Sequence, residues 1–174
     1  VYVLSETDLT FPVTHSLNTP VSVGYITIYA GGTRAIDQDV TVTLEKDPDL
    51  IDKYNHDNFD LDEDKYAKEL DLSRYTIKSY TAVMKVGDQD PYVKFPIEVR
   101  TEGLSPDSTY LIPLRIASCT PYEVNKDKSR VLYKVYIEND FTSQKSPLTL
   151  FMRGTQLRED DTKPTQISAN KILY

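Results

Sequence analysis

The sequence predicts an all-β protein, an immunoglobulin-like antiparallel β-sandwich of seven to nine strands with one or two short helical turns. Three observations lead to this prediction: short segments of alternating apolar and polar residues, turn residues between those segments, and few helical signals. Alternation with a period of two buries one face of a strand and leaves the other in solvent. Many short strands separated by regular turns are typical of sandwiches and barrels.

Five segments carry the clearest strand patterns: residues 21–30, 39–45, 92–100, 109–117 and 130–138. The first is rich in β-branched and aromatic residues, and the other four alternate. Shorter candidates are residues 1–4, 75–77, 80–86 and 148–152. The side chains expected to face a core are Val40, Val42, Leu44, Val93, Phe95, Ile97, Val99, Tyr110, Ile112, Leu114, Ile116, Val131, Tyr133, Val135 and Ile137.

Two prolines and two short segments modify this pattern. Pro96 and Pro113 lie inside predicted strands, and because proline has no N–H to donate, each predicts an edge strand or a bulge. Residues 47–54 offer a cap, a proline in the first turn and early acids, which predict one or two helical turns. Residues 62–70 are a candidate for another short turn.

The chain is expected to divide near residue 140. Residues 1–140 hold the predicted sandwich, and residues 141–174 a terminal strand and a polar linker from about Gly154. The chain begins with Val1 instead of Met and ends on the apolar Ile172-Leu173-Tyr174. We therefore expect a piece of a larger protein, with the linker leading to a missing C-terminal domain.

Composition excludes several functions. A net charge of −7 over 174 residues argues against nucleic-acid binding and against a polybasic membrane patch. No apolar run approaches the roughly 20 residues of a membrane-spanning helix. A single cysteine, Cys119, excludes an intrachain disulfide and is expected to be a partly buried core residue. With no nucleophile elbow, no phosphate-binding glycine loop and no distinguishable carboxylate pair, we expect no catalytic residues.

The densest acidic cluster is the one metal-binding candidate. Asp60, Asp62 and Asp64 match the opening of a calcium-binding loop, in which alternate carboxylates supply oxygen ligands. Two departures weaken the match: Lys65 stands where the loop needs glycine, and Asp71 replaces the bidentate glutamate. A solvated acidic loop and calcium held in another geometry both remain open. No other cofactor is expected.

Tyrosines are the binding candidates. The sequence has 13 Tyr, 5 Phe and no Trp. Tyr25 and Tyr29 share one face of their predicted strand, and Tyr136 points away from Tyr133 and Val135. Aromatic faces stack on sugar rings, so Tyr25, Tyr29 and Tyr136 are candidate glycan contacts. The competing interpretation is that these tyrosines seal a sandwich edge or a domain interface.

Several motifs together resemble one family. Residues 49–55, residues 74–77 followed by 86–87, and the Tyr-x-x-Pro-Leu-x-Ile strand of residues 110–116 resemble the DUF1735 family, the BT-3987-like N-terminal domains of Bacteroidetes proteins. The resemblance covers roughly residues 1–140. It implies an immunoglobulin-like fold with no catalytic residues of its own, in surface lipoproteins or secreted proteins linked to polysaccharide utilisation.

Three functions remain open on these grounds. The first is a non-catalytic structural or carbohydrate-binding module of a cell-surface lipoprotein, held to the outer membrane only by a lipid anchor and followed by another domain of the same polypeptide. The second is the N-terminal part of a glycoside hydrolase whose catalytic domain lies beyond residue 174. The third is an adhesion domain that binds a protein through an exposed strand edge.

Overall fold

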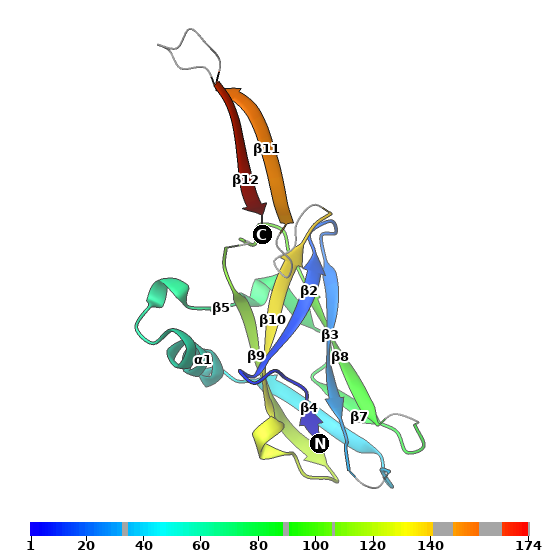
Figure 1. The fold of residues 1–174 in the computed structure, drawn as a ribbon. Helices are drawn as coiled ribbons and strands as arrows, with labels where there is room; N and C mark the ends of the chain where they lie inside the picture. The colour runs from blue at the N-terminus through cyan, green and yellow to red at the C-terminus, as the bar shows by residue number, and fades with distance from the viewer. Residues whose placement is uncertain (33–34, 89–90, 106, 141–147, 157–164, 174) are drawn as a thin grey trace.

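The computed structural model describes residues 1–173 except 33–34, 89–90, 106, 141–147 and 157–164, and beyond residue 140 it describes only the backbone of two strands. Ten of the described strands form two sheets that pack face to face (Figure 1). The predicted immunoglobulin-like β-sandwich is therefore confirmed, with one strand more than the upper end of the expected range.

The four-stranded sheet has the order β1-β3-β8-β6, with every neighbouring pair antiparallel. Its strands are β1 (Tyr2–Val3), β3 (Ser22–Tyr29), β8 (Tyr92–Val99) and β6 (Tyr75–Ile77).

The six-stranded sheet has the order β2-β10-β9-β4-β7, with β5 also paired to β9. The pairs β2–β10 and β5–β9 are parallel, which the prediction of an antiparallel sandwich did not include. The strands are β2 (Thr10–Ser16), β10 (Arg130–Glu138), β9 (Tyr110–Thr120), β4 (Val40–Lys46), β7 (Thr81–Met84) and β5 (Lys68–Glu69).

The space between the sheets holds the main core. Of the side chains predicted to face inward, all are buried except Tyr110, which is half-buried and packs against the same cluster. Cys119 also packs against this core as a partly buried residue, as predicted. Each fully buried Val, Leu, Ile or Phe contributes about 2 kcal/mol to folding, so this apolar cluster is the main source of stability.

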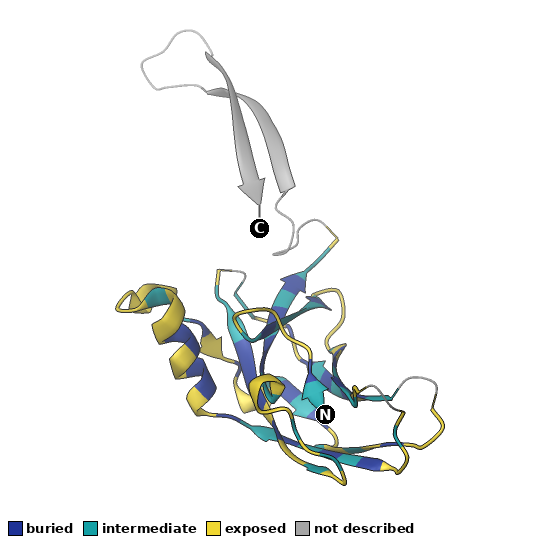
Figure 2. Cartoon of the chain, turned by 60° about the horizontal axis from the view of Figure 1, so that its bottom comes forward, coloured by how far each residue is buried: buried dark blue, intermediate teal, exposed yellow. Residues whose placement is uncertain are grey.

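Helix α1 (Asp49–Phe59) covers the outer face of the six-stranded sheet. Figure 2 shows its buried side toward the sheet and its exposed side in solvent. Its Leu50, Ile51 and Tyr54 pack against Leu111 of β9 and Leu132 of β10. β9 and β10 are therefore buried on both faces. The helix has three turns, longer than the predicted one or two.

Two polar contacts position this helix. The carboxylate of Asp47, 1% exposed, accepts hydrogen bonds from Nε and Nη2 of Arg130 on β10, the latter at 2.9 Å. The side chain of Asn55 exchanges two hydrogen bonds with the backbone of Ala67, at 2.8 and 2.9 Å. The residue before the helix is thus tied to β10, and the middle of the helix to the segment just before β5.

Short 3-10 turns follow. The turn predicted within residues 62–70 is η1 (Glu63–Lys65), and η2 (Leu72–Arg74) and η3 (Lys126–Lys128) precede β6 and β10.

The two strand prolines lie in interior strands, so the expectation of edge strands is wrong. β8 lies between β3 and β6, but β6 pairs only with Ile97 to Val99, which leaves Pro96 beyond the end of that pairing. On β9, β5 pairs with Tyr110 and Leu111 and β4 begins at Leu114. Pro113 falls between these two partners. Each proline therefore sits where no ladder hydrogen bond needs its N–H.

Two strands beyond residue 140 form a sheet of their own. β11 (Leu148–Gln156) pairs antiparallel with β12 (Thr165–Leu173), and neither pairs with a strand of the sandwich. The sequence predicted a strand at 148–152 and a polar linker after it. Thr165–Leu173 is instead a strand, which corrects the linker prediction, while residues 157–164 lie outside the described part of the chain. Local pattern is a weak guide here because the four apolar residues of β12, at 167, 169, 172 and 173, do not alternate regularly with polar ones.

A buried polar pair lies within the core. His15 of β2 is fully buried, and its Nε2 lies 2.8 Å from the hydroxyl of Tyr133. Gly24 of β3 makes room for this pair, because a Cβ there would lie 1.9 Å from the Tyr133 hydroxyl oxygen. Burial lowers the pKa of His15 from 6.5 to about 4, and burial also raises the pKa of Tyr133.

The buried histidine predicts a loss of stability in mild acid. The pKa of His15 is about 4 in the folded protein and 6.5 in the unfolded chain, so between pH 4 and pH 6.5 the unfolded chain binds more protons than the folded one. The free energy of unfolding should fall by about 3 kcal/mol as pH falls from about 7 to 4. In His15→Gln, whose amide can occupy the position of Nε2, urea unfolding should show a smaller loss over the same range. Equal losses in the two proteins would contradict a buried neutral His15.

Candidate functional site

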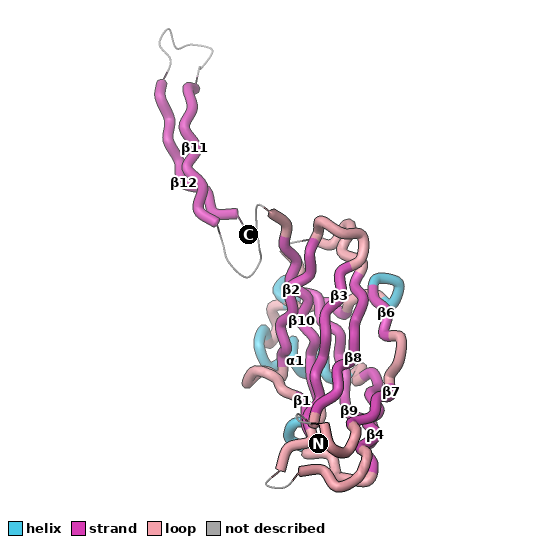
Figure 3. The backbone as a smooth tube through the Cα atoms, turned by 90° about the vertical axis from the view of Figure 1, so that its right-hand side faces the viewer, coloured by secondary structure: helices cyan, strands magenta, loops and turns pink. Residues whose placement is uncertain are grey.

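The outer face of the four-stranded sheet carries a cluster of tyrosines that contact one another. Its side chains alternate with those of the core along β3 and β8. The register places Tyr25 opposite Pro96, Thr27 opposite Lys94, and Tyr29 opposite Tyr92. Figure 3 shows β3 and β8 side by side, with α1 behind them. No helix covers this face among the described residues, whereas α1 covers the opposite side of the sandwich.

Four tyrosines and one lysine make up this surface, which we call the tyrosine face: Tyr2, Tyr25, Tyr29, Tyr92 and Lys94. The rings of Tyr2 and Tyr29 stack, with centroids 5.8 Å apart and an interplanar angle of 19°. The Tyr29 and Tyr92 centroids lie 5.7 Å apart, tilted by 45°. The three rings therefore form a row across β1, β3 and β8.

Lys94 and a glycine hold this row in place. The Lys94 ammonium lies 5.6 Å from the Tyr92 centroid and 5.9 Å from that of Tyr25, within the range of cation–π attraction. Gly31 lets the Tyr2 ring lie close to the backbone, since a Cβ at this position would be 2.6 Å from that ring. Tyr25 remains 49% exposed, so its ring is available to a ligand.

Of the three predicted glycan contacts, the structure brings two together. Tyr25 and Tyr29 both belong to the tyrosine face. Tyr136 does point out of the core, as expected, but it lies on the outer face of the six-stranded sheet, where Lys134 sits 5.2 Å from its ring centroid. The three tyrosines therefore do not form one site.

Sequence reasoning missed Tyr2 and Tyr92. The alternation of β8 places Tyr92 on the outer face, but only the β3–β8 register puts it opposite Tyr29. Tyr2 lies in a two-residue strand whose partner cannot be read from local pattern.

The acidic cluster does not converge. Asp60 follows the last residue of helix α1, and its Oδ1 lies 3.9 Å from Nδ1 of His56. Oδ2 of Asp62 lies 2.6 Å from Nζ of Lys65. All three carboxylates, Asp64 included, lie in the exposed segment after α1. Within the described ranges, no three His, Cys, Asp or Glu side chains gather closely enough to hold a metal ion. The structure thus offers the calcium loop no ready-made set of ligands.

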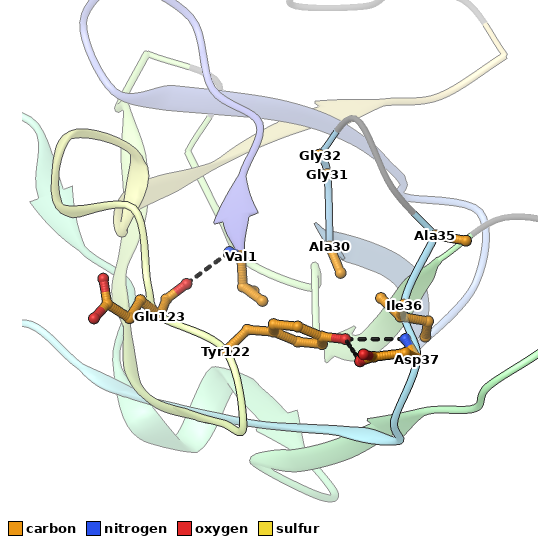
Figure 4. A pocket seen from close by; sticks show the side chains of 9 residues that line it. All are labelled: Val1, Ala30, Gly31, Gly32, Ala35, Ile36, Asp37, Tyr122 and Glu123. Atoms are coloured by element: carbon orange, nitrogen blue, oxygen red, sulfur yellow. Dashed lines mark hydrogen bonds between the residues drawn. The ribbon is translucent and has the colours of Figure 1, made fainter.

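A pocket of about 520 Å³ opens beside the end of β3, between the segments around Ala30 and Tyr122 (Figure 4). Glycine and alanine form much of its wall. The Tyr122 hydroxyl donates to the Asp37 carboxylate and accepts from the Asp37 N–H at 3.0 Å. The backbone nitrogen of Val1 donates to the Glu123 carbonyl at 2.8 Å. The main polar groups of the pocket wall are therefore hydrogen-bonded to one another.

The one cysteine and the two histidines occupy different elements of the fold, β9, β2 and α1. Burial raises the pKa of the Cys119 thiol, which favours the unreactive protonated form. His15 is engaged with Tyr133 inside the core, and His56 is on the exposed side of α1.

In the part of the chain that the structure describes, no helix is long and apolar enough to cross a membrane.

Comparison with known proteins identifies the family. A family model described as a "-like, N-terminal domain" matches residues 1–123. A multidomain protein from Bacteroides ovatus that includes DUF1735 has the same fold, with a TM-score of 0.68 and 15% identity over 94% of this chain and 52% of that one. The chain belongs to the DUF1735 family. No curated protein matches it.

Other solved structures share the DUF1735 fold. An auxiliary nutrient binding protein from Bacteroides thetaiotaomicron has a TM-score of 0.66 and 15% identity over 96% of this chain and 57% of that one. EndoBT-3987 from the same species, solved with a Man5GlcNAc product, has a TM-score of 0.53 and 16% identity over 72% of this chain and 28% of that one. At these identities the likeness concerns the fold. The chain spans between 52% and 57% of the length of three of these structures, including the two Bacteroides proteins with TM-scores of 0.68 and 0.66.

The dispersed acidic cluster predicts that calcium does not stabilise the fold. A ligand bound only by the native state must raise the melting temperature. We expect millimolar calcium, added to EDTA-treated protein, to leave the melting temperature unchanged. A variant with Asp60, Asp62 and Asp64 changed to Asn serves as the control. A calcium-dependent rise that this variant lacks would establish a site in another geometry.

Proposed function

We propose that this DUF1735 domain is a non-catalytic, carbohydrate-associated binding module of a bacterial cell-surface protein linked to polysaccharide utilisation, and that the tyrosine face is its glycan-contacting surface. The single observation that carries the proposal is the row of Tyr2, Tyr29 and Tyr92 beside the half-exposed Tyr25. The face is carried by paired strands, which hold binding side chains more rigidly than loops do.

The chemistry of the face suits sugars. The apolar side of a pyranose ring packs on an aromatic ring, while hydroxyls around that ring bond to nearby polar groups. Tyrosine supplies both a ring and a hydroxyl, and Lys94 and Thr27 add donors between the rings. A flat, open face fits a polymer chain better than it fits a small molecule, which is usually enclosed in a pocket.

The similar structures support this class of function. One is an auxiliary nutrient binding protein and another an endoglycosidase with its glycan product. In our proposal the domain sits at the surface of the cell through a lipid anchor on the larger protein, and presents a neighbouring domain of the same polypeptide to the polysaccharide.

A second candidate is the N-terminal part of a glycoside hydrolase. It is favoured by the likeness to EndoBT-3987, in which the matched region makes up 28% of the chain. In that case the catalytic residues lie outside this sequence and the domain positions them. Hydrolysis by the full-length protein, with no glycan binding by the isolated domain, would favour this candidate.

Aromatic variants test the proposal directly. Removing a stacked aromatic ring costs about 1 kcal/mol or more, because the apolar contact with the ligand is lost. On a glycan array with the isolated domain, Tyr25→Ala and Tyr92→Ala should each weaken binding about fivefold or more. The matched control is Tyr136→Ala, which removes a tyrosine beside a lysine on the opposite sheet and should bind as the wild type does.

Two results would overturn the assignment. A blank array for the wild-type domain would remove the glycan-binding role. Equal losses in Tyr25→Ala and Tyr136→Ala would show that the tyrosine face is not the contact surface.

A further inference from the structure

We infer that the tyrosine face recognises an acidic polysaccharide, one whose sugars carry carboxylate or sulfate groups. This inference rests on the proposed function and adds the charge class of its ligand. It comes from the charges around the tyrosines, which differ in sign from the rest of the molecule.

Two cations flank the tyrosine row. The Lys94 ammonium lies between the rings of Tyr92 and Tyr25, and the Lys128 ammonium lies 5.6 Å from the Tyr2 centroid. Neither lysine makes an ion pair with any described residue. Of the other described lysines, five lie within 4.0 Å of a carboxylate, namely Lys46, Lys53, Lys65, Lys78 and Lys85, while Lys68, Lys126 and Lys134 also lack an ion pair with a described residue.

The one carboxylate that β3 and β8 carry on their outer side is already neutralised. Glu98 follows Lys94 and Pro96 along the outer side of β8, opposite Val23. Its carboxylate pairs with Lys78 at 2.6 Å. The described part of the tyrosine face therefore carries a net positive charge in a chain whose total charge is −7.

This arrangement fits an anion bound beside a sugar ring. The two cation–π contacts hold the Lys94 ammonium between the rings, and its remaining protons can point to solvent. A sugar packed on Tyr25 or Tyr92 would bring an attached carboxylate or sulfate to that ammonium, which would donate a charge-assisted hydrogen bond. The chain's overall negative charge repels a polyanion, so attraction has to come from this local group.

Matched polymers separate charge from backbone. We would measure binding of the isolated domain by titration calorimetry to polygalacturonate and its carboxyl-reduced neutral form, and to dextran sulfate and dextran. The first pair differs only in carboxylates, and the second only in sulfates, so the two pairs distinguish the sources of negative charge. We expect at least one acidic polymer to bind about fivefold more tightly than its neutral counterpart, the size of a well-placed surface ion pair.

Two lysine variants provide the decisive comparison. Lys94→Gln should abolish the preference for the acidic polymer with only a small loss of melting temperature, because the side chain is exposed and cation–π contacts of exposed lysines are weak. The control is Lys134→Gln, which changes the net charge equally and removes the same kind of contact, with Tyr136, on the opposite sheet. It should keep the preference.

The outcomes are distinguishable. Equal binding of acidic and neutral polymers, both weakened by Tyr25→Ala, would overturn the acidic inference and leave the proposed glycan function standing. Equal loss of preference in Lys94→Gln and Lys134→Gln would also overturn it, because the effect would then follow net charge. No binding to these polymers, together with a blank glycan array, would remove the proposed function and the inference with it.

Discussion

Packing of helix α1 on the outer face of the six-stranded sheet decides which surface of the sandwich stays open. Leu50, Ile51 and Tyr54 bury Leu111 and Leu132, so that sheet has a second apolar layer outside the main core. The four-stranded sheet has no such cover among the described residues. Its outer side chains are instead tyrosines and polar residues, together with Val23 and Pro96, and tyrosine tolerates water on one side and an apolar partner on the other.

Two buried polar contacts also hold the sheets and the helix in register. The buried carboxylate of Asp47 is stabilised only because Arg130 meets it with two hydrogen bonds, and loss of either partner would leave an unpaired charge beside the helix. In the core, the contact between His15 and Tyr133 needs the space left by Gly24. These positions fix how the two sheets and the helix fit together. On the outer side of β3 and β8, the one ion pair among the described residues is that of Glu98 with Lys78.

Local sequence pattern predicted the inter-sheet core well, because alternation along a strand reports directly which side chains face inward. It did not predict long-range pairing. Strand β2, which pairs in parallel with β10, contains Pro12 and alternates weakly, so the sequence did not predict it. The packing of α1 on the sheet was not predicted either, and it accounts for the burial of Leu111 of β9 and Leu132 of β10 on their outer faces. Pro96 and Pro113 indicated missing ladder bonds correctly, yet the strands are interior because their neighbours are short or staggered.

The candidate site was predictable only in part for the same reason. Tyr25 and Tyr29 lie four residues apart on one strand, so their shared face is a local property. The contacts with Tyr2 and Tyr92 depend on the register of three strands, and the separation of Tyr136 depends on which sheet β10 joins. Tyr25, Tyr29 and Tyr136, which the sequence alone could not distinguish as candidates, therefore lie on two opposite faces of the fold.

The claim that the four-stranded sheet presents the binding face is tested most directly by hydrogen–deuterium exchange of the domain with and without a bound polysaccharide. Strand amides exchange more slowly when a ligand suppresses local opening. Slower exchange confined to β3, β8 and the segment around Tyr2 is the predicted result. Protection centred on α1, β9 and β10, or on the pocket beside Tyr122, would contradict it.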